Sequence, residues 1–233
     1  MKTMLRPETA RYIKNEIAAG RRVVAPRYGD GEYLMMSGQR DAGKELKSSM
    51  GPLLNKAIKR KGQLICTVPG LNKNSIWSKT AKYIRKQSEH DLYGTGAWTR
   101  WDMLHDNEIL YKFFTKKVLL VSSLTEEAKK IFPDFSMYTM PARYASTKYK
   151  ESLEDISKIC CDFDNILFAC GPIGKVIIAD LIDKTDANMI DIGHILGVIL
   201  RIKRHYASWA RNLAKQGKLD AVVDSFLEKL GGN

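Results

Sequence analysis

Residues 165–195 read NILFACGPIGKVIIADLIDKTDANMIDIGHI, and this stretch decides the fold of the chain. Its first five residues are apolar after Asn165 and suit a buried strand, and Gly171-Pro172 then gives a turn signal. A helix-length segment follows, and residues 188–191 again have the character of a strand. A strand, a helix and a second strand in this order form a βαβ unit, which predicts a parallel sheet.

The same alternation extends toward the N-terminus. Strand-like runs recur at helix-length intervals, at residues 23–25, 63–68, 117–121 and 137–140. An amphipathic helix from Pro7 to Gly20 precedes them, and a second helix is expected from about residue 75 to 87. The chain has no linker or repeat, so we predict one α/β domain over residues 1–233: a Rossmann-like, mostly parallel sheet with helices on both faces. Such sheets bind ligands at the carboxyl ends of their strands.

The first strand ends in a run of glycines and charged residues, Arg27-Tyr28-Gly29-Asp30-Gly31-Glu32. In extended backbone, residues i and i+2 point to the same side, so we expect Asp30 and Glu32 to present two carboxylates to one point. Such oxygen ligands suit Mg²⁺ or Mn²⁺, with a phosphorylated substrate completing the shell. Arg27 is suited to phosphate oxygens, and Gly29 and Gly31 let a ligand approach the backbone. A polar turn between strand and helix is the alternative.

This run resembles the signature of a known family, the GT-D type glycosyltransferases. In these bacterial nucleotide-sugar-dependent enzymes, the N-terminal strand ends in an Arg-aromatic-Gly-Asp-Gly-Glu run with a metal-binding Asp-x-Glu. A second match follows in the family's order: Gly171-Pro172, a helix with Asp180-Leu181, and Asp191-Ile192-Gly193-His194 at a strand end. The resemblance spans about residues 22–200. This sequence differs from the family's pattern at residues 122–127 and 196–199.

The resemblance implies a GT-D type fold and a hexosyltransferase activity. The implied donor is a nucleotide-diphosphate sugar, specifically a UDP-sugar, with Mn²⁺ or Mg²⁺ held by Asp30 and Glu32. The implied acceptor is a glycan, a glycoprotein or a lipid-linked molecule. Two other function classes stay open: a hydrolase or phosphotransferase on the same kind of sheet, and a basic nucleic-acid-binding protein, for which the sequence contains no binding motif.

Two further places on the predicted edge are candidates for the site. The Gly171-Pro172 turn opens a helix, so its backbone N–H groups and the helix dipole suit a phosphate, although a plain connection is the alternative. Asp191 and His194 follow the last strand, on the same edge as Asp30. We take them as candidate catalytic residues, because a histidine there can contact diphosphate or act as a base near neutral pH. A structural histidine and a helix N-cap at Asp191 are the alternatives.

A third candidate lies in the segment from Gly94 to Trp101, which combines small residues with two indoles. Arg100 and Trp101 are candidate nucleotide-sugar contacts, because indoles offer stacking surfaces for a sugar or a base. Packing inside the protein is the alternative for these indoles.

The net charge of +12 is concentrated in two stretches, residues 46–88 and 192–219, which contain no acidic residue. The second stretch belongs to a C-terminal segment, about residues 194–230, that we predict to be an amphipathic basic helix. Its apolar side would pack on this domain or on a second copy in a homodimer. Its basic side would be solvated, or would contact an anionic acceptor or membrane surface.

The N-terminus lacks the apolar core of a secretory signal, which favours a cytoplasmic location, with peripheral contact to the inner face of the membrane as an option. The four cysteines have no metal-ligand spacing. We therefore expect reduced thiols that mainly serve packing.

Overall fold

The computed structural model describes residues 2–4, 6–39, 47–67, 76–88, 90, 92–95 and 107–231. The strands are β1 (Lys2–Thr3), β2 (Val24–Ala25), β3 (Arg27–Tyr28), β4 (Ile65–Thr67), β5 (Leu92–Thr95), β6 (Val118–Ser122), β7 (Ser136–Thr139), β8 (Asn165–Ala169) and β9 (Asn188–Asp191). The α-helices are α1 (Arg6–Ala18), α2 (Asp30–Met36), α3 (Lys47–Ala57), α4 (Ile76–Ser88), α6 (Asn107–Phe114), α7 (Thr125–Lys129), α8 (Tyr149–Ile159), α9 (Pro172–Leu181), α10 (His194–Ile199), α11 (Ser208–Lys215) and α12 (Leu219–Gly231). Short 3₁₀ helices are η2 (Ala145–Lys148), η3 (Cys160–Asp162) and η4 (Lys203–His205).

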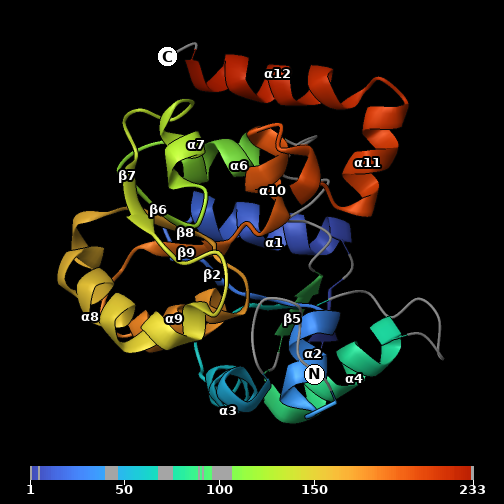
Figure 1. Ribbon diagram of the computed structural model, residues 1–233, viewed down its shortest axis with the longest axis vertical. Helices are drawn as coiled ribbons and strands as arrows, with labels where there is room; N and C mark the ends of the chain where they lie inside the picture. The colour runs from blue at the N-terminus through green and yellow to red at the C-terminus, as the bar shows by residue number, and fades with distance from the viewer. Residues whose placement is uncertain are drawn as a thin grey trace.

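The strands form two parallel sheets that share one stretch of chain (Figure 1). One sheet has the order β2-β9-β8-β6-β7 and the other the order β1-β5-β4-β3, and every strand pair in them is parallel. Residues 24–28 connect them, because β2 pairs with β9 and β3 pairs with β4. The N–H groups of Leu64 and Cys66 donate to the carbonyls of Val24 and Pro26, which continues the hydrogen bonding across the junction. The parallel α/β fold predicted from the sequence is confirmed.

Apolar side chains from successive strand residues go to opposite faces of the sheet. In β6, Leu120 packs in one cluster with side chains of α1, α6 and α12, whereas Leu119 and Val121 pack in another with α3, α8 and α9. Figure 1 shows these two groups of helices on opposite sides of the strands. Because both faces are covered, the central strands consist of apolar residues without a polar face, as is typical of parallel sheets.

The C-terminal segment differs from its prediction. The single helix expected over about residues 194–230 is wrong, because the chain forms α10, η4, α11 and α12 instead. Arg201 and Gly217 have positive φ, 55° and 67°, and these left-handed residues separate the helices. The apolar residues still pack on this domain, as Ile199 does with its fully buried side chain. Part of the basic side is paired within the segment, where Arg201 bonds to Asp224.

The described residues also bear on membrane-spanning helices, on the cysteines and on the loop predicted at Gly94. No helix in the described ranges is long and apolar enough to cross a membrane. All four cysteines are free thiols, and Cys66 and Cys160 are buried, whereas Cys161 is exposed. Leu92–Thr95 form β5, so the first two residues of the predicted loop at Gly94 belong to a strand.

Candidate active site

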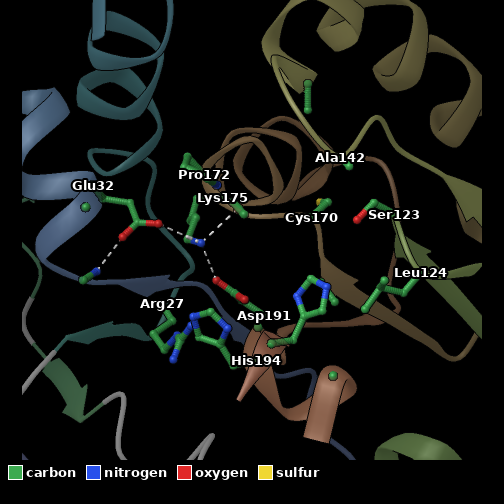
Figure 2. Close-up of a pocket in the computed structure, with 18 of the residues that line it drawn as sticks. Arg27, Glu32, Ser123, Leu124, Ala142, Cys170, Pro172, Lys175, Asp191 and His194 are labelled. Atoms are coloured by element: carbon green, nitrogen blue, oxygen red, sulfur yellow. Dashed lines mark hydrogen bonds and ion pairs between the residues drawn. The ribbon is translucent and has the colours of Figure 1, made fainter. Parts of the chain in front are cut away.

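A cavity of about 350 Å³ lies at the carboxyl ends of β3, β6, β8 and β9, and we call it the strand-end cavity (Figure 2). Nine residues selected from the sequence line it: Arg27, Gly29, Asp30, Gly31, Glu32, Gly171, Pro172, Asp191 and His194. Segments from both ends of the chain therefore meet where a parallel sheet is expected to bind its ligand. The other two, Arg100 and Trp101, lie outside the described residues.

Glu32 lies in the first turn of a helix and not at the end of a strand. The extended geometry predicted for Asp30 and Glu32 is wrong, because α2 begins at Asp30 and both residues lie in its first turn. Glu32 Oε2 accepts the backbone N–H of Gly29 at 2.8 Å, which satisfies a donor that the helix leaves unpaired. The carboxylate also reaches across to α9, where Lys175 lies.

Lys175 is buried between two carboxylates, with only 3% of its side chain exposed. Its Nζ lies 3.0 Å from Glu32 Oε1 and 2.8 Å from Asp191 Oδ2, and it donates to the carbonyl oxygen of Gly171 at 3.0 Å. The ammonium thus donates a hydrogen bond to the carbonyl and forms ion pairs with the two carboxylates. We call Lys175, Glu32 and Asp191 the buried ion triad. It connects α2, α9 and β9 at the wall of the strand-end cavity (Figure 2).

The charges of the triad support each other. Burial alone would raise the pKa of Glu32, but the Lys175 ammonium and the Gly29 N–H outweigh burial and hold this pKa below its ordinary value. Burial likewise lowers the pKa of Lys175, yet Asp191 and Glu32 outweigh it and keep that pKa above the usual range. The pair between Glu32 and Lys175 is therefore fully charged at neutral pH.

This arrangement predicts a loss of stability in acid. Because the folded-state pKa of Glu32 lies below the ordinary 4.5, its contribution is complete above that value and disappears as the pH falls through the folded pKa. We expect the difference in melting temperature between the wild type and Glu32→Gln to be constant from neutral pH down to about 5 and to shrink below 4.5. Thermal melts of both proteins across this range measure it, and a difference that does not change in acid would contradict it.

Two charged side chains of the strand-end cavity take no part in the buried ion triad. Asp30 and Arg27 line the cavity, and neither side chain has a hydrogen bond or ion pair to another residue of the described ranges. Arg27 lies over Gly193, since a Cβ added there would be 2.3 Å from its Nη2. The cavity thus offers an open carboxylate and an open guanidinium fork, the group best suited to phosphate.

Glycines precede two of the helices that begin at the strand-end cavity. Gly171 precedes α9 with φ 71°, and Gly193 precedes α10 with φ 48°, which a residue with a side chain rarely adopts. The N-cap of α10 is Gly193, so the alternative that Asp191 caps this helix is wrong, and the Asp191 carboxylate serves Lys175 instead. His194 is the first residue of α10 and lines the cavity.

Two basic residues of the strand-end cavity, Lys175 and His205, were not selected from the sequence. Lys175 follows Gly171 by four residues, which places it one turn into the helix on the side of its start, and this spacing is a signal that could have selected it. His205 lies in η4, and its Cβ would be 2.5 Å from a Cβ added at Gly197. The predicted continuous helix concealed it, and no spacing in the sequence distinguishes it.

The charges of the strand-end cavity bear on the expected metal ion. Three carboxylates, Asp30, Glu32 and Asp191, face two permanent cations, Arg27 and Lys175. An anionic diphosphate would therefore enter a site with excess negative charge, which an additional cation would offset. No cluster of three His, Cys, Asp or Glu side chains that could hold a metal by itself exists among the described residues. Asp30 and Glu32 fit such an ion as a pair of hard oxygen ligands only with substrate oxygens completing its shell.

Comparisons with known proteins identify the fold. No protein-family model matches the chain, and no curated protein matches its sequence. A structure of domain of unknown function 1792, described as having a distinct glycosyltransferase fold, matches with a TM-score of 0.64 and 22% identity, over 84% of this chain and 79% of that one. A second, described as a new glycosyltransferase (DUF1792) from Streptococcus sanguinis, matches with a TM-score of 0.64 and 20% identity, over 84% and 82%. The chain therefore has the glycosyltransferase fold of these domains, which confirms the fold implied by its two motifs.

Proposed function

We propose that this protein is a glycosyltransferase that transfers a sugar from a UDP-sugar to a hydroxyl group of a glycan, glycoprotein or lipid-linked acceptor. The observation that carries the proposal is the strand-end cavity, where the open Arg27 guanidinium and the open Asp30 carboxylate lie beside the N-terminus of α9. The fold shared with structures that are described as glycosyltransferases supports it.

In this proposal the diphosphate of the donor lies between Arg27 and the start of α9. Arg27 donates two parallel hydrogen bonds to phosphate oxygens, and the positive end of the α9 dipole favours the same charge. A Cβ added at Gly171 would meet nothing within 4 Å, so the space in front of this helix is open to a phosphate group.

We further propose that Asp30 and Glu32 hold a Mn²⁺ or Mg²⁺ ion together with the diphosphate. Asp30 supplies an open carboxylate, and Glu32 lies in the same helical turn. When bound, the divalent ion offsets the negative charge that develops on the departing diphosphate.

The transfer forms a bond from the acceptor oxygen to the anomeric carbon and breaks the bond from that carbon to the diphosphate, so that UDP leaves. The acceptor hydroxyl must lose its proton in this step. We propose His194 as the residue that takes this proton, because its side chain lines the strand-end cavity and imidazole is the commonest general base in enzymes. Asp191 acts by holding Lys175, with which it is paired in the buried ion triad.

Calorimetric titration of UDP into the wild type and Asp30→Asn, each with and without Mn²⁺, tests the donor site. With Mn²⁺, we expect Asp30→Asn to bind UDP about tenfold or more weakly, which is typical for loss of support to a metal. Without Mn²⁺, Asp30→Asn should bind UDP no more weakly than the wild type, because the asparagine removes a negative charge that repels the diphosphate. Asp134→Asn is the matched control, since Asp134 is exposed and does not line the strand-end cavity.

The outcomes separate the alternatives. Equal UDP affinity of the wild type and Asp30→Asn in Mn²⁺ would show that the metal assignment is wrong. Absence of UDP binding under every condition would show that the donor assignment is wrong. Incubation with UDP-sugars and acceptors then distinguishes a transferase from a hydrolase, because a hydrolase releases the free sugar and forms no new glycoside.

A further inference from the structure

Lys175 has the environment that a bound cation would have. Its ammonium contacts two carboxylate oxygens and one carbonyl oxygen at 2.8–3.0 Å, and its side chain is almost fully buried. Three oxygens already surround the ammonium, so contact of Lys175 with a ligand in the strand-end cavity would displace one of these partners.

A divalent ion bound at Asp30 and Glu32 would need the same Glu32 carboxylate that pairs with Lys175. Its Oε2 already accepts the N–H of Gly29, and its Oε1 faces Lys175. A divalent ion on Oε1 would lie beside the ammonium, and two cations at such a distance repel strongly inside a protein. The ion and Lys175 therefore cannot both be held closely by this oxygen.

We propose that Lys175 competes with the divalent ion for Glu32. In the ion-free protein, the ammonium holds the Glu32 carboxylate in place. When an ion binds at Asp30 and Glu32, Lys175 releases Oε1 and keeps its contacts to Asp191 and to the carbonyl of Gly171. Lys175 thereby keeps the metal affinity of the free protein low, and the ion is held firmly only together with a diphosphate. This inference rests on the metal site of the proposed function.

Direct Mn²⁺ titration without nucleotide, followed by calorimetry and by the electron paramagnetic resonance signal of free Mn²⁺, tests the competition. We expect Lys175→Met to bind Mn²⁺ about tenfold more tightly than the wild type, a change that corresponds to ~1.4 kcal/mol. Lys158→Met is the matched control. The Lys158 ammonium also lies near two carboxylates, Glu154 at 2.9 Å and Asp155 at 3.7 Å, but it is exposed on α8 and outside the strand-end cavity.

Melting temperatures supply a second readout. Lys175→Met leaves two carboxylates without their counter-charge, so it should melt below the wild type, and Mn²⁺ should raise its melting temperature more than that of the wild type. If this variant does not fold, the double variant Lys175→Met, Asp191→Asn removes one of the two carboxylates. It should show the same gain in Mn²⁺ affinity, because Glu32 is released in both.

Each outcome decides a separate point. Equal or weaker Mn²⁺ binding by Lys175→Met, with normal Mn²⁺-dependent UDP binding by the wild type, overturns the competition and leaves the proposed function intact. Absence of Mn²⁺ binding in every variant, both with and without UDP, overturns the metal site itself. Tighter binding in Lys175→Met but not in Lys158→Met supports the competition.

Discussion

Replacement of Glu32 with alanine is expected to lower the free energy of unfolding by about 3–5 kcal/mol, because one member of a buried ion pair is removed and the other keeps its charge. Lys175 would retain Asp191 and the carbonyl of Gly171, but the side of its ammonium that faces Glu32 would border the space left by the carboxylate. The backbone N–H of Gly29 would lose its acceptor as well. Urea unfolding followed by circular dichroism measures this loss.

Glu32→Gln separates the two contributions. A glutamine at this position can still accept the N–H of Gly29, as in other capping boxes, but it carries no charge for Lys175. We expect its stability to lie between those of the wild type and Glu32→Ala, with about 1 kcal/mol between the two variants for the helix cap. A stability of Glu32→Ala within 1 kcal/mol of the wild type would show that the buried ion triad does not support the fold.

Replacement of Gly193 with alanine should both destabilise the protein and weaken UDP binding. Gly193 has φ 48° and ψ −124°, and strained backbone of this kind costs a side-chain-bearing residue about 1–3 kcal/mol. The new Cβ would also lie 2.3 Å from Nη2 and 3.0 Å from Cζ of Arg27, so the guanidinium must move away from the position it holds in the strand-end cavity. We expect UDP affinity to fall about tenfold or more, as for the loss of a charged hydrogen bond.

Two controls assign this effect to Arg27. Gly217→Ala places the same side chain at φ 67° with no atom within 4 Å, between α11 and α12, so it should lower stability without a change in UDP affinity. In an Arg27→Ala background, Gly193→Ala should cause no further loss of UDP affinity, because the displaced group is already absent. A full additional loss in the double variant would mean that Gly193 acts on the ligand without Arg27.

The central strands could be predicted closely, whereas β1 and β5 could not. β8 and β9 coincide with the predicted runs 165–169 and 188–191, because strands covered on both faces are recognisable as short apolar runs between turns. β1 has only two residues, too few to display a period, and β5 contains Gly94, which indicates a loop instead. The breaks between the C-terminal helices could not be predicted for another reason. The separate short helices pack on the same core, so the helical spacing of apolar residues continues across Arg201 although the helix ends there.

The position of the site was predictable from the sequence, but the ion pair between Glu32 and Lys175 was not. Asp30, Glu32, Asp191 and His194 share one edge because the carboxyl ends of parallel strands lie together, and this follows from the order of strands alone. The contact of Glu32 with Lys175 depends on how α2 and α9 approach each other in space, which no local spacing encodes. The prediction therefore assigned Glu32 to a metal ion and overlooked the lysine that faces it.

The pairing of the junction at residues 24–28 also determines when the larger sheet can form during synthesis. Val23 N–H bonds to Asn188 Oδ1, 165 positions later, and β9 is the partner of β2 in the larger sheet among the described strands. Contacts of such long range form slowly, because a large loop must close before they contribute. A nascent chain that has not reached β9 carries β2 as an open strand edge, which other chains can pair with. The interval between synthesis of β2 and β9 is thus a period in which β2 lacks its partner strand in the larger sheet.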